Sequence, residues 1–263
     1  MPPVTLSRRR LLTAAALGAS GLALPGCDAF DGLLGSGERV RGVLARANSL
    51  TYRAQRWLIG ADALAQEFGE ADIRQPQRPN GVTAPDDQAY KTLLAGDFAV
   101  WRLTVGGLVE RPLSLSREAL MAMPSRTQIT RHDCVEGWSC IAKWTGVPLA
   151  LVLDQAKPKP EARFVVFRCL DTIERGLGGD VKYYESLDML DARHPQTILA
   201  YGLNDGPLPV ENGAPLRLRV ERQLGYKMAK YVHGIELVDT LAPFGRGMGG
   251  YWEDNGYDWY AGI

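Results

Sequence analysis

The chain has 263 residues, of which 46% are hydrophobic and 23% are charged, a composition typical of a globular protein with one large domain or two small ones. Thirty Lys and Arg residues balance thirty Asp and Glu residues, so the formal net charge is zero. This balance argues against a nucleic-acid-binding protein, which needs a strongly basic surface.

Residues 1–27 differ in composition from the rest of the chain. A basic start with Arg8, Arg9 and Arg10 precedes an apolar run of 14 residues, LLTAAALGASGLAL. This run is shorter than the roughly 20 residues that span a bilayer, and it is typical of a cleaved export signal. The paired arginines resemble a twin-arginine signal, which exports folded proteins.

The sequence LPGC at the end of this segment resembles the lipobox of bacterial lipoproteins, in which the cysteine, here Cys27, becomes acylated. The alternative is an ordinary cleavage site with Cys27 nearby by chance. A lipid at Cys27 would anchor the chain to a membrane without spanning it. The sequence therefore predicts a periplasmic protein, membrane-anchored if the lipobox is used.

Residues 28–79 are predicted to form a helical arm and a linker. Between Glu38 and about Phe68, apolar residues recur three and four positions apart, as in one amphipathic helix or a pair of helices. The stretch RQPQRPNGVTAPDD that follows is rich in Pro, Gly, Asn and Asp, so it is predicted to be a loop.

Residues 80–263 are predicted to form one α+β domain with a mixed β-sheet core and short helices. Strands rich in β-branched or aromatic residues outnumber the helices and do not alternate regularly with them. One helix is expected to begin behind a Ser116 cap and another at Pro148. The predicted strands are 99–109, 163–170, 215–221 and 231–239, and the predicted helices are 116–123, 148–156 and 187–192.

The sequence RHDCVEGWSC places Cys134 beside a histidine, two acids and a tryptophan. A nucleophilic thiolate would need His132 as a base, and a spacing of two residues brings both side chains to one face only on a strand. A zinc site would need about four ligands, which the sequence does not supply. A soft thiolate bound to a cofactor-borne metal requires Cys134 alone. Cys140 and Cys169 either pair with each other or are buried free thiols.

Three motifs, in order, resemble the molybdopterin-binding domain of the sulfite oxidase family. They are RHDCVEGWS at 131–139, WTGVPL at 144–149, and HPQTILAYGLNDGPLPVENGAPLRLRVERQLGYKMAK at 194–230. The resemblance runs from about residue 80 to the C-terminus. It is strongest to the bacterial branch that contains the periplasmic methionine sulfoxide reductase catalytic subunit.

This resemblance implies a sulfite oxidase-type fold and a molybdenum ion carried by one molybdopterin, with Cys134 as the metal ligand. Pterin-contacting positions fall on Asn212, on Arg217 and on the segment Met228, Ala229 and Lys230, the last partly through backbone amides. Strand alternation in APLRLRV also predicts that Arg217 and Arg219 share one face, opposite the apolar residues.

Other site assignments follow the family less closely. Asn80 lies where the family has an early pterin-contacting asparagine, but the surrounding loop differs. Cys169 stands in place of a threonine beside the cofactor, and a thiol is a weaker donor than a hydroxyl. His132 is a candidate catalytic group facing the substrate, with a structural hydrogen bond as the alternative. Glu136 and Trp138 are expected to anchor the loop.

The resemblance implies a periplasmic oxidoreductase that transfers an oxygen atom in a two-electron reaction, such as reduction of a small or protein-borne sulfoxide. Haem and flavin motifs are absent from the sequence, so a separate electron-transfer partner, a cytochrome by analogy, is expected. VEGWS stands where sulfite-oxidising members have asparagine and arginines, which disfavours sulfite dehydrogenase. The sequence ends before the family's dimerisation domain, which predicts a monomer.

The sequence is also compatible with two other functional classes. One is a lipoprotein that uses the same fold as a non-catalytic binding module. The other is a cysteine hydrolase with Cys134 and His132. The aromatic and acidic tail from Tyr251 is expected either to dock on the domain or to line the rim of a substrate or partner surface.

Overall fold

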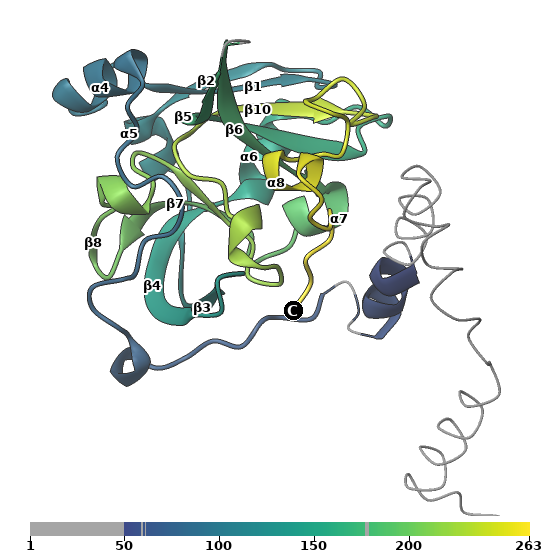
Figure 1. The fold of residues 1–263 in the computed structure, drawn as a ribbon, viewed down its shortest axis with the longest axis horizontal. Helices are drawn as coiled ribbons and strands as arrows, with labels where there is room; N and C mark the ends of the chain where they lie inside the picture. Colours follow the sequence, from purple (N-terminus) through teal and green to yellow (C-terminus); the bar gives the residue numbers. More distant parts are fainter. Residues whose placement is uncertain (1–49, 59, 61, 177–178) are drawn as a thin grey trace, which may run out of the picture. The chain divides into compact units, whose positions relative to one another are not determined.

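The computed structural model describes residues 50–263 except 59, 61 and 177–178 (Figure 1). The chain divides into two units, Met1–Thr51 and Tyr52–Ile263, and the architecture below belongs to the second. The predicted export signal, Cys27 and the start of the predicted arm lie outside the described residues. In the described part of the chain, no helix is long and apolar enough to cross a membrane.

The segment before the domain is less helical than the sequence pattern predicts. Residues 52–58 are helical, but residues 63–66 have no regular structure, so the predicted continuation to Phe68 is wrong. Instead, Glu67 bridges to Thr130, and the Phe68 N–H donates to the Ile129 carbonyl at 2.9 Å. The free backbone groups at the edge of strand β3 (Arg126–Asp133) hold this segment in an extended form.

Two five-stranded sheets form the domain (Figure 1). The first has the order β2-β1-β10-β5-β6, and only its β1–β10 pair is parallel. Its strands are β1 (Arg102–Gly107), β2 (Leu113–Ser116), β5 (Phe164–Gly176), β6 (Gly179–Asp188) and β10 (Val232–Val238). This mixture of directions confirms the predicted mixed sheet.

The second sheet is antiparallel, with the order β3-β4-β7-β8 and with β9 paired to β7. Its strands besides β3 are β4 (Ser139–Pro148), β7 (Ile198–Leu203), β8 (Gly206–Pro207) and β9 (Arg217–Arg219). The hairpin between β3 and β4 carries the RHDCVEGWSC motif at its tip, so the motif lies at one end of this sheet.

The helices are short, as predicted, and side chains cap several of them. The Ser116 hydroxyl accepts from the Ala119 N–H at 3.1 Å, which confirms the predicted cap. Asp87 and Asp188 cap two other helices in the same way. The helices are α4 (Gln88–Ala95), α5 (Arg117–Met121), α6 (Leu149–Ala156), α7 (Met189–Ala192) and α8 (Tyr251–Asp254), with 3-10 turns η1 (Glu70–Asp72), η2 (Val210–Asn212) and η3 (Gly225–Lys227).

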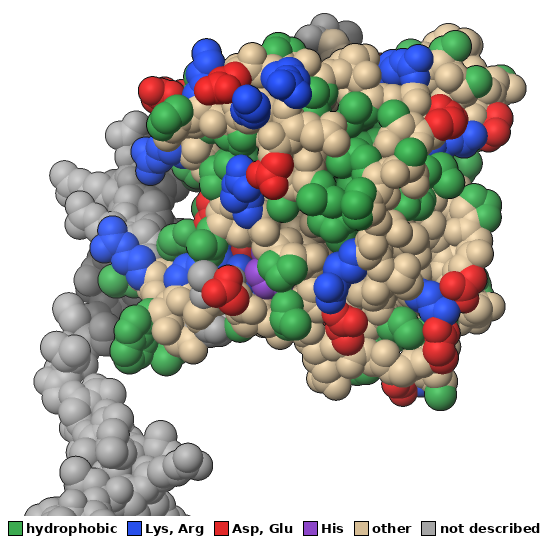
Figure 2. Space-filling view, turned by 180° about the vertical axis from the view of Figure 1, so that it is seen from behind, with side chains coloured by type: hydrophobic (Ala, Val, Ile, Leu, Met, Phe, Trp, Pro, Cys, Tyr) green, Lys and Arg blue, Asp and Glu red, His purple; other side chains and the backbone are tan. Residues whose placement is uncertain are grey.

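The hydrophobic core includes apolar residues from both sheets and from α6. Leu216, Leu218 and Val220 point into it, so β9 buries its apolar face as strand alternation predicts. On the face of the molecule shown in Figure 2, lysines and arginines lie beside aspartates and glutamates and form no continuous basic surface among the described residues.

Candidate functional site

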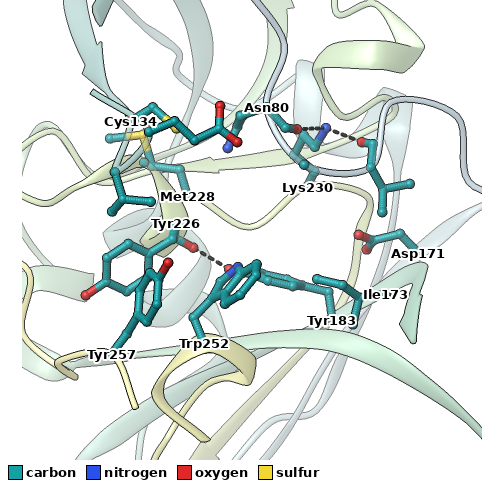
Figure 3. A pocket seen from close by; sticks show the side chains of 15 residues that line it. Asn80, Cys134, Asp171, Ile173, Tyr183, Tyr226, Met228, Lys230, Trp252 and Tyr257 are labelled. Atoms are coloured by element: carbon teal, nitrogen blue, oxygen red, sulfur yellow. Dashed lines mark hydrogen bonds between the residues drawn. The ribbon is translucent and has the colours of Figure 1, made fainter. Parts of the chain in front are cut away.

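A cavity of about 150 Å³ opens beside Cys134 (Figure 3). Its walls come from segments far apart in the sequence: the loop 80–82, the β3–β4 turn, β5, β6, the segment 225–230, and the C-terminal tail. Of the predicted site residues, Asn80, Cys134, Met228 and Lys230 line it. The others, His132, Cys169, Asn212, Arg217 and Ala229, are buried and do not line it.

Cys134 lies in a closed turn directly after β3. Its N–H donates to the Trp138 carbonyl at 2.9 Å, and its carbonyl accepts from the Gly137 N–H at 3.0 Å. Gly137 has φ 83°, a left-handed conformation that suits glycine. The Trp138 indole N–H donates to the Glu136 carboxylate at 2.8 Å, so these two side chains stabilise the turn as predicted.

The Cys134 thiol is half-buried, and burial is the largest of the effects that raise its pKa above the ordinary value. A nucleophilic cysteine needs the opposite, a neighbour that lowers the pKa. Binding to a metal would deprotonate the sulfur regardless of this shift. The environment of Cys134 therefore suits a metal ligand better than a free nucleophile.

His132 is fully buried, so the predicted substrate-facing role is corrected by the structure. Its Nδ1 lies 3.1 Å from Arg219 Nη1 and 3.3 Å from Met228 Sδ. Burial, followed by the charges of Arg217 and Arg219, holds its pKa well below the usual range. The neutral ring accepts a hydrogen bond from Arg219, which is the structural alternative that the sequence left open.

Close packing fixes the His132 ring against the segment that precedes Met228. A Cβ on Gly225 would lie 2.3 Å from His132 Cε1 and 2.4 Å from Nε2, so only glycine fits there. His132 therefore joins the β3 strand to η3, and through that contact it positions one wall of the cavity.

Arg217 and Arg219 lie on the same face of β9, and both stack on Trp144, with guanidinium carbons 5.2 and 4.3 Å from the ring centroid. They differ in their partners. Arg219 forms a fully buried ion pair with Glu221, with Nη2 2.6 Å from the carboxylate. Arg217 forms no ion pair with a carboxylate among the described residues, which leaves its charge uncompensated.

Arg217 instead donates to neutral oxygens. Its Nη1 donates to the Asn212 carbonyl and its Nη2 to Asn80 Oδ1, each at 3.0 Å. Its Nε is buried without a partner, as is Asn212 Nδ2. Burial, then the charge of Arg219, lowers the Arg217 pKa to about 9.

Lys230 is a second buried cation without a carboxylate partner among the residues that the structure describes. Its ammonium donates to the carbonyls of Asn80 at 2.6 Å and of Val82 (Figure 3), and also to the Glu211 carbonyl at 3.0 Å. Burial, then the charge of Arg217, lowers its pKa to about 7. Two adjacent cations held by neutral acceptors form a site suited to an anion.

The structure decides between a disulfide and two free thiols, the alternatives that the sequence left open for Cys140 and Cys169. Cys134, Cys140 and Cys169 are all free thiols in the described part of the chain, so Cys140 and Cys169 do not pair. Cys169 belongs to the apolar core rather than the cavity wall, and burial raises its pKa well above the usual range. Ala229 is also buried, with its carbonyl accepting from the Leu218 N–H at 2.8 Å.

Sequence reasoning missed several residues that line the cavity. Asp171 on β5 and Tyr183 on β6 come from strands without a motif, so nothing in the sequence marked them. Trp252 and Tyr257 belong to the aromatic tail and are stacked with ring centroids 5.1 Å apart. The tail thus both docks on the domain and lines the cavity, and the two expectations for it are compatible.

A buried charge cluster holds α8 in this position. The Lys227 ammonium contacts the carboxylates of Glu185 and Glu253, and all three side chains are almost completely buried. Glu253 lies next to Trp252 on α8, while Glu185 belongs to β6. The cluster therefore joins the tail to the sheet at the wall of the cavity.

Comparison with known proteins identifies the family. A sequence profile described as "Oxidoreductase molybdopterin binding domain" matches residues 91–243. The chain is 34% identical to the provisionally named protein-methionine-sulfoxide reductase subunit YedZ1 of Azospira oryzae, over 98% of this chain and 89% of that protein. It is also 34% identical to the protein-methionine-sulfoxide reductase catalytic subunit MsrP of Ralstonia nicotianae, over 90% of this chain and 70% of that one.

Among solved structures, the sulfane dehydrogenase SoxCD from Paracoccus pantotrophus aligns with a TM-score of 0.48 and 25% identity, covering 54% of this chain and 39% of that one. The profile covers more than half of the chain, and YedZ1 matches almost all of it. The chain therefore belongs to the family of oxidoreductases with a molybdopterin-binding domain, and it is a molybdopterin-dependent enzyme.

Proposed function

We propose that this chain is an exported molybdenum enzyme that reduces a sulfoxide to a thioether. The reaction consumes two electrons and two protons, breaks the S–O bond and releases water. Support comes from relatives named as methionine sulfoxide reductase subunits and from the chemistry of the cavity beside Cys134. The cofactor, when bound, supplies the two-electron redox chemistry.

The residues at the site fit a molybdopterin. Arg217 Nε and Asn212 Nδ2 are buried donors without acceptors, and Arg217 and Lys230 are buried cations that form no ion pair with a described carboxylate. A phosphate would supply acceptor oxygens for the unpaired donors and a negative charge that neutralises both cations. Cys134 offers a soft thiolate that suits the metal.

The assignments of the individual residues follow from this fit. Cys134 would ligate the metal, while Arg217 and Lys230 would hold the phosphate. Asn80, Asn212 and Met228 are proposed as further cofactor-binding positions, and the family resemblance alone adds Cys169 and Ala229, which are buried in the core behind the cavity wall. His132 is proposed to position Met228 through its 3.3 Å contact, without touching the substrate.

One observation favours a neutral substrate over sulfite. Beside Cys134 in sequence, the Glu136 carboxylate lines the cavity, and Lys230 is the one Lys or Arg among its described lining residues. Its ammonium already binds three carbonyls. A dianion such as sulfite would meet net repulsion there, whereas a sulfoxide is uncharged and can pack its alkyl groups on Trp252 and Tyr257.

The proposal also covers the cellular location of the enzyme, its electron donor and its oligomeric state. The leader of residues 1–27 would direct twin-arginine export, and Cys27 would carry a lipid anchor at the membrane. Electrons would come from a separate partner, a cytochrome in the simplest case. The catalytic unit is proposed to act as a monomer on a small or protein-borne sulfoxide.

A substrate panel tests the proposed reaction. Full-length protein matured with its cofactor should reduce methionine sulfoxide and other sulfoxides with an artificial electron donor. Its kcat/KM for the best sulfoxide should exceed its kcat/KM for sulfite oxidation, because the sulfite dianion is repelled by the Glu136 carboxylate. Faster oxidation of sulfite than reduction of any sulfoxide or N-oxide would refute the proposal.

The aromatic wall gives a further prediction. Trp252→Ala should raise KM for a dialkyl sulfoxide about tenfold, because it removes apolar surface that covers the substrate, while kcat changes little. Trp57→Ala, at a tryptophan that is 83% exposed, is the matched control and should leave both constants unchanged. Steady-state kinetics of the two variants decides between a binding wall and a purely structural tail.

A further inference from the structure

Asp171 is a buried acid that faces the same cavity as Cys134. It lies on β5, it is 4% exposed, and its Oδ1 has no hydrogen-bond partner. A buried carboxylate oxygen without a donor is costly and needs a reason. In the view of Figure 3, Cys134 and Met228 lie at one end of the cavity, while Asp171 and Ile173 lie at the other.

The charged groups around Asp171 do not provide a partner for its Oδ1 atom. Lys230 and Lys182 are the cations that act on it, yet neither forms an ion pair with it. The other titratable groups that its charge affects are neutral in their ordinary state: Tyr90, Tyr183, Tyr231 and Cys169. Burial raises the pKa of Asp171 to about 6, and the hydrogen bond that opposes this rise comes from its own backbone N–H, which leaves Oδ1 without a donor.

A ligand with N–H donors would satisfy this carboxylate. A molybdopterin contains a phosphate and a dithiolene, which are anionic, and a pterin ring system, whose ring nitrogens and exocyclic amine carry N–H groups. The phosphate and dithiolene would be repelled by Asp171 and fit Arg217, Lys230 and the metal instead. The pterin ring is the part of the cofactor that can donate to a carboxylate.

We infer that Asp171 accepts a hydrogen bond from an N–H group of the pterin and so is a further cofactor-binding residue. A cofactor that begins at Cys134 and extends along the cavity reaches Asp171 at its far end (Figure 3). Lys230 and Asp171 then recognise opposite features of the cofactor, its negative charge and its donor edge. The inference depends on the cofactor of the family and not on the sulfoxide reaction.

Asp171→Asn in the full-length protein tests this contact. The substitution should weaken cofactor retention without lowering the thermal stability of the cofactor-free protein. In the cofactor-loaded form, the variant should release molybdenum and pterin about tenfold faster than the wild type, because a charge-assisted hydrogen bond is lost. In the cofactor-free form, the variant should be at least as heat-stable as the wild type at pH 8. The mutation removes a carboxylate whose raised pKa lowers stability as pH rises from about 4 through 6.

The control is Asp154→Asn, at an exposed aspartate that pairs with Arg193 at 2.8 Å, which should change neither quantity. Asp171→Ser provides a second variant if Asp171→Asn fails to fold, and it should also release the cofactor faster. Release at the wild-type rate in the folded variants would overturn the inference. A raised KM for sulfoxide with unchanged cofactor release would overturn it too, because Asp171 would then face the substrate. Since cofactor release is measured without turnover, this test and the substrate panel can fail independently.

Discussion

Cys134→Ser is expected to lower turnover by at least about a thousandfold, which corresponds to roughly 4 kcal/mol of lost transition-state stabilisation. A hydroxyl is a harder and much less acidic ligand than a thiol, so it does not replace the soft thiolate at the metal. The turn that holds Cys134 depends on backbone hydrogen bonds and on the Glu136–Trp138 contact, neither of which uses the sulfur. The fold should therefore survive the substitution, and turnover can be measured on folded, exported protein.

The matched control for this substitution is Cys140→Ala. Cys140 is a buried free thiol six residues away on β4, and the structure gives its sulfur no role at the cavity. Its variant should keep turnover within about twofold of wild type, apart from a modest loss of stability from the smaller side chain. If Cys134→Ser retained most of the activity, the thiolate would not be the metal ligand.

Arg217→Met is expected to lower the cofactor content of the purified protein by a factor of about ten to a hundred. The substitution removes a guanidinium contact to phosphate worth about 1.5–3 kcal/mol. Because Arg217 is buried without a carboxylate partner among the described residues, its removal should not destabilise the cofactor-free chain through an orphaned acid. Metal analysis and thermal unfolding of the same preparations measure the two effects.

Arg219→Met should behave in the opposite way. It leaves the Glu221 carboxylate buried and unpaired, which should destabilise the fold by about 3–5 kcal/mol even without cofactor. The two arginines share a strand face and a stacking partner, Trp144, so they form a matched pair. Equal loss of stability in both variants, with equal cofactor content, would contradict the division between a cofactor-binding and a structural arginine.

Local patterns in the sequence were sufficient to predict much of the fold. The segments 163–170 and 231–239 became β5 and β10 because β-branched and aromatic residues favour strands. The alternation in APLRLRV placed Arg217 and Arg219 on one side of β9. It did not show that this side would be buried, because the Trp144 surface that covers it comes from β4.

The helical arm shows where local pattern fails. The spacing of apolar residues up to Phe68 suits a helix, but the exposed edge of β3 offers backbone partners that a helix would leave unused. Within the site, sequence spacing also failed to predict the position of His132. Its position two residues before Cys134 suggested a shared face, whereas β3 ends at Asp133 and the turn separates the two side chains.

The cavity could be predicted only in part. Motifs marked Cys134, Met228 and Lys230, and the looser family match marked Asn80; all four line the cavity. Asp171 and Tyr183 enter it through the pairing of β5 with β6, and no spacing along the chain reveals which of their residues face inward. Trp252 reaches it because the buried Lys227 cluster fixes α8 against the sheet.

The most direct measurement is the molybdenum X-ray absorption spectrum of the full-length protein purified after export with its cofactor. We expect stoichiometric molybdenum in the wild type and one sulfur neighbour fewer at the metal in Cys134→Ser. A properly matured wild type without molybdenum, or an identical sulfur shell in both proteins, would contradict it.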